Sequence, residues 1–181
     1  MPLSKKHFHT SDDFWALPDG ERAELIDGRL YAMAPPNFIH QKLISEFTQL
    51  IGAFIKKHGG RCEIIPAPFA VNLDAEDTNW VEPDISVICD LSKLTDKGCI
   101  GAPDFIIEIV SPSSRKHDYS RKNALYSDAG VREYWIVDPE KERVTVYHYE
   151  EDAAPILYPF DIPVTSGIYP ELHITVKELI E

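Results

Sequence analysis

The sequence lacks long apolar runs. No stretch approaches the roughly 18 consecutive apolar residues that a membrane-spanning helix needs, so we expect no membrane span. Low-complexity segments and internal repeats are also absent, which excludes solenoids and similar arrays. The basic first residues, MPLSKKHFHT, are not followed by an apolar segment, so they do not read as a secretory signal.

Cysteine is scarce as well. The chain has three cysteines, Cys62, Cys89 and Cys99, and none of them forms a CxxC motif. An odd number without this spacing disfavours both a disulfide framework and a zinc knuckle. Because disulfides are rare in reducing compartments, we expect reduced thiols and a cytoplasmic location.

Positive charge is also in short supply. The 18 lysines and arginines face 30 aspartates and glutamates, which gives a net charge of −12. General affinity for nucleic acid depends on basic side chains that neutralise phosphates, so this balance disfavours a protein that coats DNA non-specifically. It leaves room for a local basic groove or a metal-assisted contact.

The length and composition are those of one ordinary globular domain. Of the 181 residues, 44% are hydrophobic and 27% charged, which is typical of a chain with a real core. We expect a single domain over residues 1–181, with an N-terminal arm and short helix (1–21), a core (22–149) and a C-terminal extension (150–181).

Hydrophobic periodicity gives the order of the elements. Asp27–Gly28 predicts a hairpin within residues 22–34, and Asn37 is a suitable cap for a main helix over residues 38–58. The remaining expected elements are strands at 62–71, 81–89 and 101–110, a polar connection at 91–100, a helix at 118–129, a hairpin at 133–149, and a strand near 156–160. The fold class is α/β (α+β), with a central mixed β-sheet flanked by helices, an N-terminal β-hairpin and a C-terminal hairpin.

Two of the predicted strands each carry one acid in an apolar run. Asp84 lies in VEPDISVIC and Glu108 lies in GAPDFIIEIV. A carboxylate inside a buried strand costs free energy unless it is compensated. If the two strands pair, Asp84 and Glu108 converge at one end of the sheet and need a cation. A hard divalent ion such as Mg²⁺ suits all-oxygen ligands.

A lysine follows on the next predicted helix. Tyr119, Lys122, Tyr126 and Ala129 fall on one helical face, which directs Lys122 toward the sheet. There it can orient a water molecule or stabilise negative charge that develops at phosphorus. The competing interpretation is structural: Glu108 and Lys122 form a buried ion pair, and Asp84 caps a strand.

The order of these motifs resembles the PD-(D/E)XK nuclease superfamily, and within it the Uma-type family of restriction endonucleases. The matching segments are ELIDGRLYAMAPPNFIHQKL, VEPDISVI, PDFIIEIVSPSSRKHDYSRKNALYSDAGVREYWIVDP and the VYHY hairpin, which together cover roughly residues 22–149. The resemblance implies a restriction-endonuclease-like core and hydrolysis of DNA phosphodiester bonds that depends on Mg²⁺ or Mn²⁺.

The resemblance also implies site residues. Asp84 and Glu108 match the catalytic, metal-binding acids. The lysine expected two residues after Glu108 is replaced by Val110, and Lys122 on the following helix matches the position from which the family supplies it. His40 and Glu24 match further polar positions, where an accessory role and a structural role compete.

A small basic cluster accompanies the predicted site. Arg115, Lys116 and Arg121 either contact phosphates or form a solvated face. Two functions from different classes therefore compete: a metal-dependent endonuclease, and a catalytically silent nuclease-fold module that acts with a partner protein. DNA is the expected partner, and the apolar hairpin strands are compatible with a homodimer.

Overall fold

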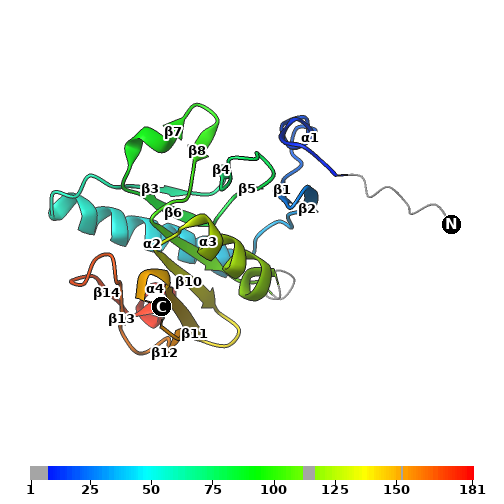
Figure 1. Ribbon diagram of the computed structural model, residues 1–181. Coiled ribbons are helices and arrows are strands. Elements are labelled where there is room, and N and C mark those ends of the chain that lie inside the picture. Colours follow the sequence, from blue (N-terminus) through cyan, green and yellow to red (C-terminus); the bar gives the residue numbers. More distant parts are fainter. Residues whose placement is uncertain (1–7, 112–116, 152) are drawn as a thin grey trace.

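The computed structural model describes residues 8–111, 117–151 and 153–181 (Figure 1). Its main layer is a six-stranded central sheet with the order β12-β11-β10-β9-β6-β3. The strands of this sheet are β3 (Glu63–Pro66), β6 (Ile85–Ile88), β9 (Phe105–Ile109), β10 (Glu133–Asp138), β11 (Arg143–His148) and β12 (Ile156–Pro159). β9 and β10 run parallel and the other neighbours antiparallel, so the sheet is mixed, as predicted.

A second six-stranded sheet lies beside the central one. Its order is β2-β1-β5-β4-β8-β7, and most of its strands are very short. They are β1 (Ala23–Ile26), β2 (Arg29–Ala32), β4 (Val71–Asn72), β5 (Trp80–Val81), β7 (Leu94–Thr95) and β8 (Gly98–Ile100). We call this the small sheet. The hairpin of β1 and β2 turns at Asp27–Gly28, where both residues have positive φ, as the sequence predicted.

Helices and C-terminal segments cover the sheets (Figure 1). α2 (Phe38–Lys57) is the long helix, and the Asn37 side chain caps it by accepting a hydrogen bond from the His40 amide. The remaining helical segments are α1 (Ser11–Trp15), η1 (Leu91–Lys93), the π-helical η2 (His117–Lys122), α3 (Asn123–Ala129), η3 (Tyr149–Glu151) and α4 (Val176–Ile180). A two-stranded sheet of β13 (Val164–Thr165) and β14 (His173–Ile174) completes the C-terminal region.

The two faces of the central sheet bury different clusters. One face packs under α2 and α4 through residues such as Phe47, Ile107 and Trp135. The other face packs under α3 and the small sheet through residues such as Ile106 and Tyr126. Alternate residues of a strand point to opposite faces, so Glu108 lies on the face that α3 covers.

Three predicted strands or connections were wrong in detail. The stretch 62–71 is two strands in different sheets, β3 and β4, separated by a segment that contains the cis Ala67–Pro68 bond. The stretch 81–89 is likewise split between β5 and β6, and Asp84 lies in the connection. The expected polar connection at 91–100 contains η1 and the β7–β8 hairpin. Short strands that change sheets have the same apolar pattern as one longer strand, so periodicity does not separate them.

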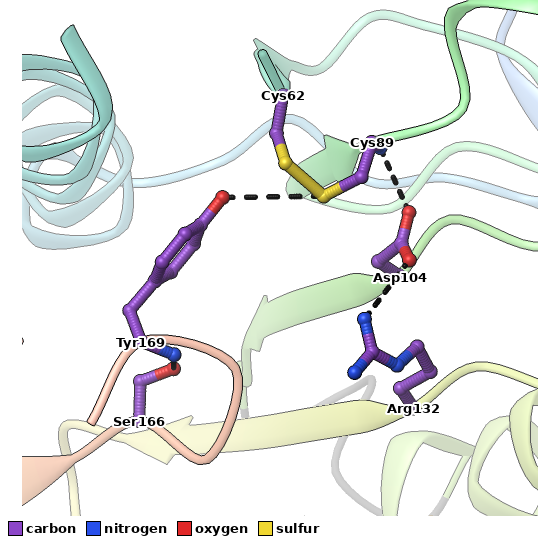
Figure 2. The surroundings of a disulfide bond; sticks show 6 residues. All are labelled: Cys62, Cys89, Asp104, Arg132, Ser166 and Tyr169. Atoms are coloured by element: carbon purple, nitrogen blue, oxygen red, sulfur yellow. Dashed lines mark hydrogen bonds and ion pairs between the residues drawn. A yellow bond between two sulfur atoms is a disulfide. The ribbon is translucent and has the colours of Figure 1, made fainter. Parts of the chain in front are cut away.

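The expectation of reduced thiols was also wrong. Cys62 and Cys89 form a disulfide, and Cys99 is free and buried. Figure 2 shows the bond beside the Tyr169 hydroxyl, with the Cys89 amide donating to Asp104 and Asp104 paired with Arg132. The two cysteines flank the antiparallel β3–β6 pair, whose first register is Glu63 with Ile88. Cysteine spacing cannot reveal this pairing, because it depends on the strand register.

No described helix is long and apolar enough to cross a bilayer.

Candidate active site

The two predicted acids meet at one end of the β6–β9 pair. The register aligns Ile85 with Ile107, so Asp84 stands one step beyond the ladder, opposite Glu108. An Asp84 carboxylate oxygen accepts the Ile109 amide at 2.7 Å, and the Asp84 amide donates to Glu108 Oε2 at 3.4 Å. Both carboxylates are buried. The local backbone therefore holds the acids together, as the pairing argument predicted.

Lys122 reaches the same point from the helical segment after β9. Its Nζ lies 2.8 Å from Glu108 Oε1 and 2.9 Å from Glu24 Oε1, with Asp118 Oδ1 at 3.7 Å. Only 5% of the Lys122 side chain is exposed. The predicted orientation of the helical face is confirmed, although the segment begins as the π-helix η2 before α3. The expected replacement for the lysine missing at Val110 thus contacts Glu108.

The two accessory residues of the prediction lie at the same site. His40, in the first turn of α2, places Nε2 3.1 Å from Asp84 Oδ2, and its buried Nδ1 has no hydrogen-bond partner among the described residues. Glu24, on β1, accepts the Glu82 amide at 3.1 Å besides contacting Lys122. Four separate elements therefore supply the cluster that surrounds Lys122 and Asp84.

Two further site residues escaped the sequence interpretation. The buried Tyr126 hydroxyl donates to Glu108 Oε1 at 2.7 Å, and Asp118 adds a third carboxylate near Lys122. The signal for both was present, because each lies four residues from Lys122 on a helix and therefore shares its face. The sequence interpretation placed Tyr126 on this face but gave it no role in the site.

The predicted basic cluster is only partly visible. Arg121 is exposed, and its guanidinium carbon lies 4.5 Å from the centre of the Tyr31 ring. Arg115 and Lys116 lie outside the described residues.

Burial controls the electrostatics of the site. Removal from water raises the pKa of the Glu108 carboxyl well above its usual range, Lys122 opposes this, and the carboxylates of Asp84, Asp118 and Glu24 add to it. The pKa of Lys122 is also raised well above the ordinary lysine value: burial favours the neutral amine, but Glu108 and the other acids outweigh it. The cluster therefore holds more carboxyl groups than Lys122 alone can balance.

The donor set fits a hard divalent cation. Asp84 and Glu108 offer carboxylate oxygens, which Mg²⁺ and Mn²⁺ prefer. In residues 8–111, 117–151 and 153–181, no group of three or more His, Cys, Asp or Glu side chains is arranged to hold a metal. A site with two protein carboxylates takes its other ligands from backbone oxygen, water and substrate, which is usual for Mg²⁺.

The cluster is least buried at His40 and Asp84. The side chains of His40 and Asp84 are 16% and 10% exposed, against 5% for Lys122. A cavity of about 390 Å³ lies instead beside the disulfide, lined by Arg61, Cys89, Asp90 and Leu91. The catalytic candidates therefore form a closed, polar cluster rather than an apolar pocket.

Comparison with known proteins assigns the chain to a family. The model of the Uma2 family, described as "Putative restriction endonuclease", matches residues 11–176. The chain belongs to the Uma2 family. An uncharacterized protein of Synechocystis sp., slr1290, is 27% identical to this Uma2 chain over 139 residues, which are 76% of this chain and 72% of the relative.

A solved structure shows the same fold. It is described as a putative nuclease belonging to DUF820 from Anabaena variabilis, with a TM-score of 0.77 and 24% identity. The match covers 94% of this Uma2 chain and 97% of that one. The predicted restriction-endonuclease-like core is therefore confirmed.

Proposed function

We propose that this Uma2 protein is a metal-dependent endonuclease that hydrolyses DNA phosphodiester bonds at the Asp84, Glu108 and Lys122 cluster. The observation that carries the proposal is the meeting of two buried acids, Asp84 just before β6 and Glu108 on β9, with Lys122 from η2. A structural ion pair needs one acid and one base, whereas this cluster has more carboxylates than Lys122 balances. The description of the family supports the reaction class.

Each residue has a role that its position allows. Asp84 and Glu108 would hold Mg²⁺ or Mn²⁺, and the ion would supply Lewis-acid chemistry by polarising a phosphoryl oxygen and making water more acidic. Lys122 orients the attacking water and stabilises negative charge on the phosphate oxygens. His40 contacts Asp84 and fixes the orientation of its carboxylate. Glu24 keeps Lys122 protonated and in place.

Cleavage of supercoiled plasmid DNA in Mn²⁺ tests this assignment. We expect Asp84→Asn and Glu108→Gln to reduce the cleavage rate by at least about 100-fold, since each removes a carboxylate that would bind the metal ion acting on the reacting phosphate. Both variants keep the side-chain shape and remove charge from an overcrowded cluster, so they should fold. Glu63→Gln removes an exposed acid from the neighbouring β3 and is the matched control. Equal rates in all four proteins would refute the assignment.

The competing function is a nuclease-fold module without catalysis, acting with a partner protein. The observation that favours it is that the described residues contain no ready-made group of three metal ligands. Calorimetric titration with Mn²⁺ separates the two functions. Binding that disappears in Asp84→Asn and Glu108→Gln supports the endonuclease, and the absence of any binding at this cluster supports the silent module.

A further inference from the structure

A tyrosine and an arginine form a stacked pair beside the candidate active site. The Arg121 guanidinium carbon lies 4.5 Å from the centre of the Tyr31 ring, well within the range of a cation–π contact. Arg121 is exposed and Tyr31 is half-buried. They come from η2 and β2, which are far apart in the sequence.

The strand register places this pair next to the proposed catalytic residues. Tyr31 is directly opposite Glu24 in the β1–β2 hairpin, and opposite residues of an antiparallel pair share one face. Glu24 contacts Lys122, and Arg121 precedes Lys122 in the chain. The stacked pair therefore borders the Glu24–Lys122 contact on two sides.

The acidic character of the site suggests a binding role for the positive charge of Arg121. Glu24, Glu108 and Asp118 surround Lys122, so its charge is already balanced inside the protein. The whole chain carries a net charge of −12. A DNA backbone needs positive charge at the surface to approach such a cluster. Arg121 presents an exposed guanidinium there, whereas the nearby Arg22 is paired with Glu82.

We propose that Arg121 binds a DNA backbone phosphate beside the scissile one, and that Tyr31 positions the guanidinium by stacking. Stacking occupies the flat face of the guanidinium and leaves its N–H groups, which lie in the plane, available for bidentate binding of phosphate. This inference rests on the proposed function, because it assigns part of the substrate contact of the same site. Arg121 is a binding residue, and Tyr31 is a positioning residue.

Two measurements on the full chain test the pair. One is the anisotropy of a labelled duplex of about 20 base pairs in EDTA, and the other is steady-state cleavage in Mn²⁺. A hydrogen-bonded contact to a charged group is worth a factor of about 10 or more. We therefore expect Arg121→Ala and Tyr31→Leu each to raise Kd and KM about tenfold while kcat is retained.

The conservative variants separate positioning from folding. Tyr31→Phe keeps the ring and should bind and cleave DNA like the wild type. Arg121→Lys loses the planar guanidinium that binds phosphate through two N–H groups, so it should weaken DNA binding. Arg121→Ala should also reduce the slope of log Kd against log salt by about 1, because one phosphate contact is lost. The control is Arg29→Ala, which removes an exposed charge from the same β2 strand.

The outcomes separate the proposed DNA contact of Arg121 and Tyr31 from the proposed nuclease activity. If Arg121→Ala and Tyr31→Leu behave like Arg29→Ala while Asp84→Asn still abolishes cleavage, the stacked pair is not a DNA contact and the nuclease assignment stands. If the wild type cleaves no DNA yet duplex binding in EDTA depends on Arg121 and Tyr31, the contact stands without the nuclease.

Discussion

Lys122 holds the candidate site together at the scale of single residues. Its ammonium group lies among three carboxylates in a buried cluster that includes Glu108 and Glu24. Each of these charges loses hydration when it is buried, so the cluster is stable only while the lysine is present. The same arrangement groups more carboxyl groups than one lysine can balance, and a divalent cation can balance the others once they are ionised.

Removal of this lysine should therefore destabilise the protein. We expect Lys122→Met to lower the free energy of unfolding by about 3–5 kcal/mol, since it leaves buried carboxylates without a partner. Adding Glu108→Gln should recover part of the loss. Urea denaturation measures both effects, with Lys141→Met on the β10–β11 turn as an exposed control. A loss no larger than that of Lys141→Met would show that the cluster does not depend on Lys122.

The sequence predicted three of the residues that meet at the site, but it did not reveal every side chain that contacts them. Asp84, Glu108 and Lys122 could be brought together from strand pairing and a helical face, because both periodicities are simple. Asp118 and Tyr126 could have been found by the same spacing. The burial of the site could not, because it depends on how β1 and η2 pack over the sheet.

At the scale of elements, the two helix N-caps show that similar cap residues can differ in how much they stabilise the fold. Asn37 caps α2 with its side chain, whereas Thr175 stands at the N-cap of α4 without a side-chain bond. We expect Asn37→Ala to cost about 1 kcal/mol of unfolding free energy and Thr175→Ala only a few tenths. Thermal unfolding of both variants checks this, and an equal loss would contradict the structural difference between the two caps.

Long, regular elements were predictable and short ones were not. α2 and the β10–β11 hairpin follow one period over many residues, so their place was clear from the sequence. β4 and β5 have two residues each, and their assignment to the small sheet depends on partners distant in sequence. The split around Pro83 matters most, because it puts Asp84 at a strand end, where its side chain can turn toward Glu108.

At the scale of the whole molecule, the reactivity of the three cysteines provides a test of the fold. The disulfide joins the ends of β3 and β6, and burial raises the pKa of the Cys99 thiol to about 11. At pH 8 Cys99 is therefore almost entirely protonated as well as buried, and thiolate is the reactive form. Without a reductant, Ellman's reagent should detect no thiol in the native protein, one after unfolding in guanidinium, and three after reduction. Three thiols without reduction would show that the disulfide does not form.

We propose that the end of the β6–β9 pair and the helical segment η2 together build one cluster that binds a divalent metal and cleaves phosphodiester bonds. An anomalous difference map from a crystal soaked in Mn²⁺ tests it most directly. The account predicts a peak within about 2.5 Å of oxygens of both Asp84 and Glu108, a range that covers carboxylate coordination, and no peak there in Glu108→Gln. Mn²⁺ bound only at acids outside this cluster, or no peak at all, would contradict it.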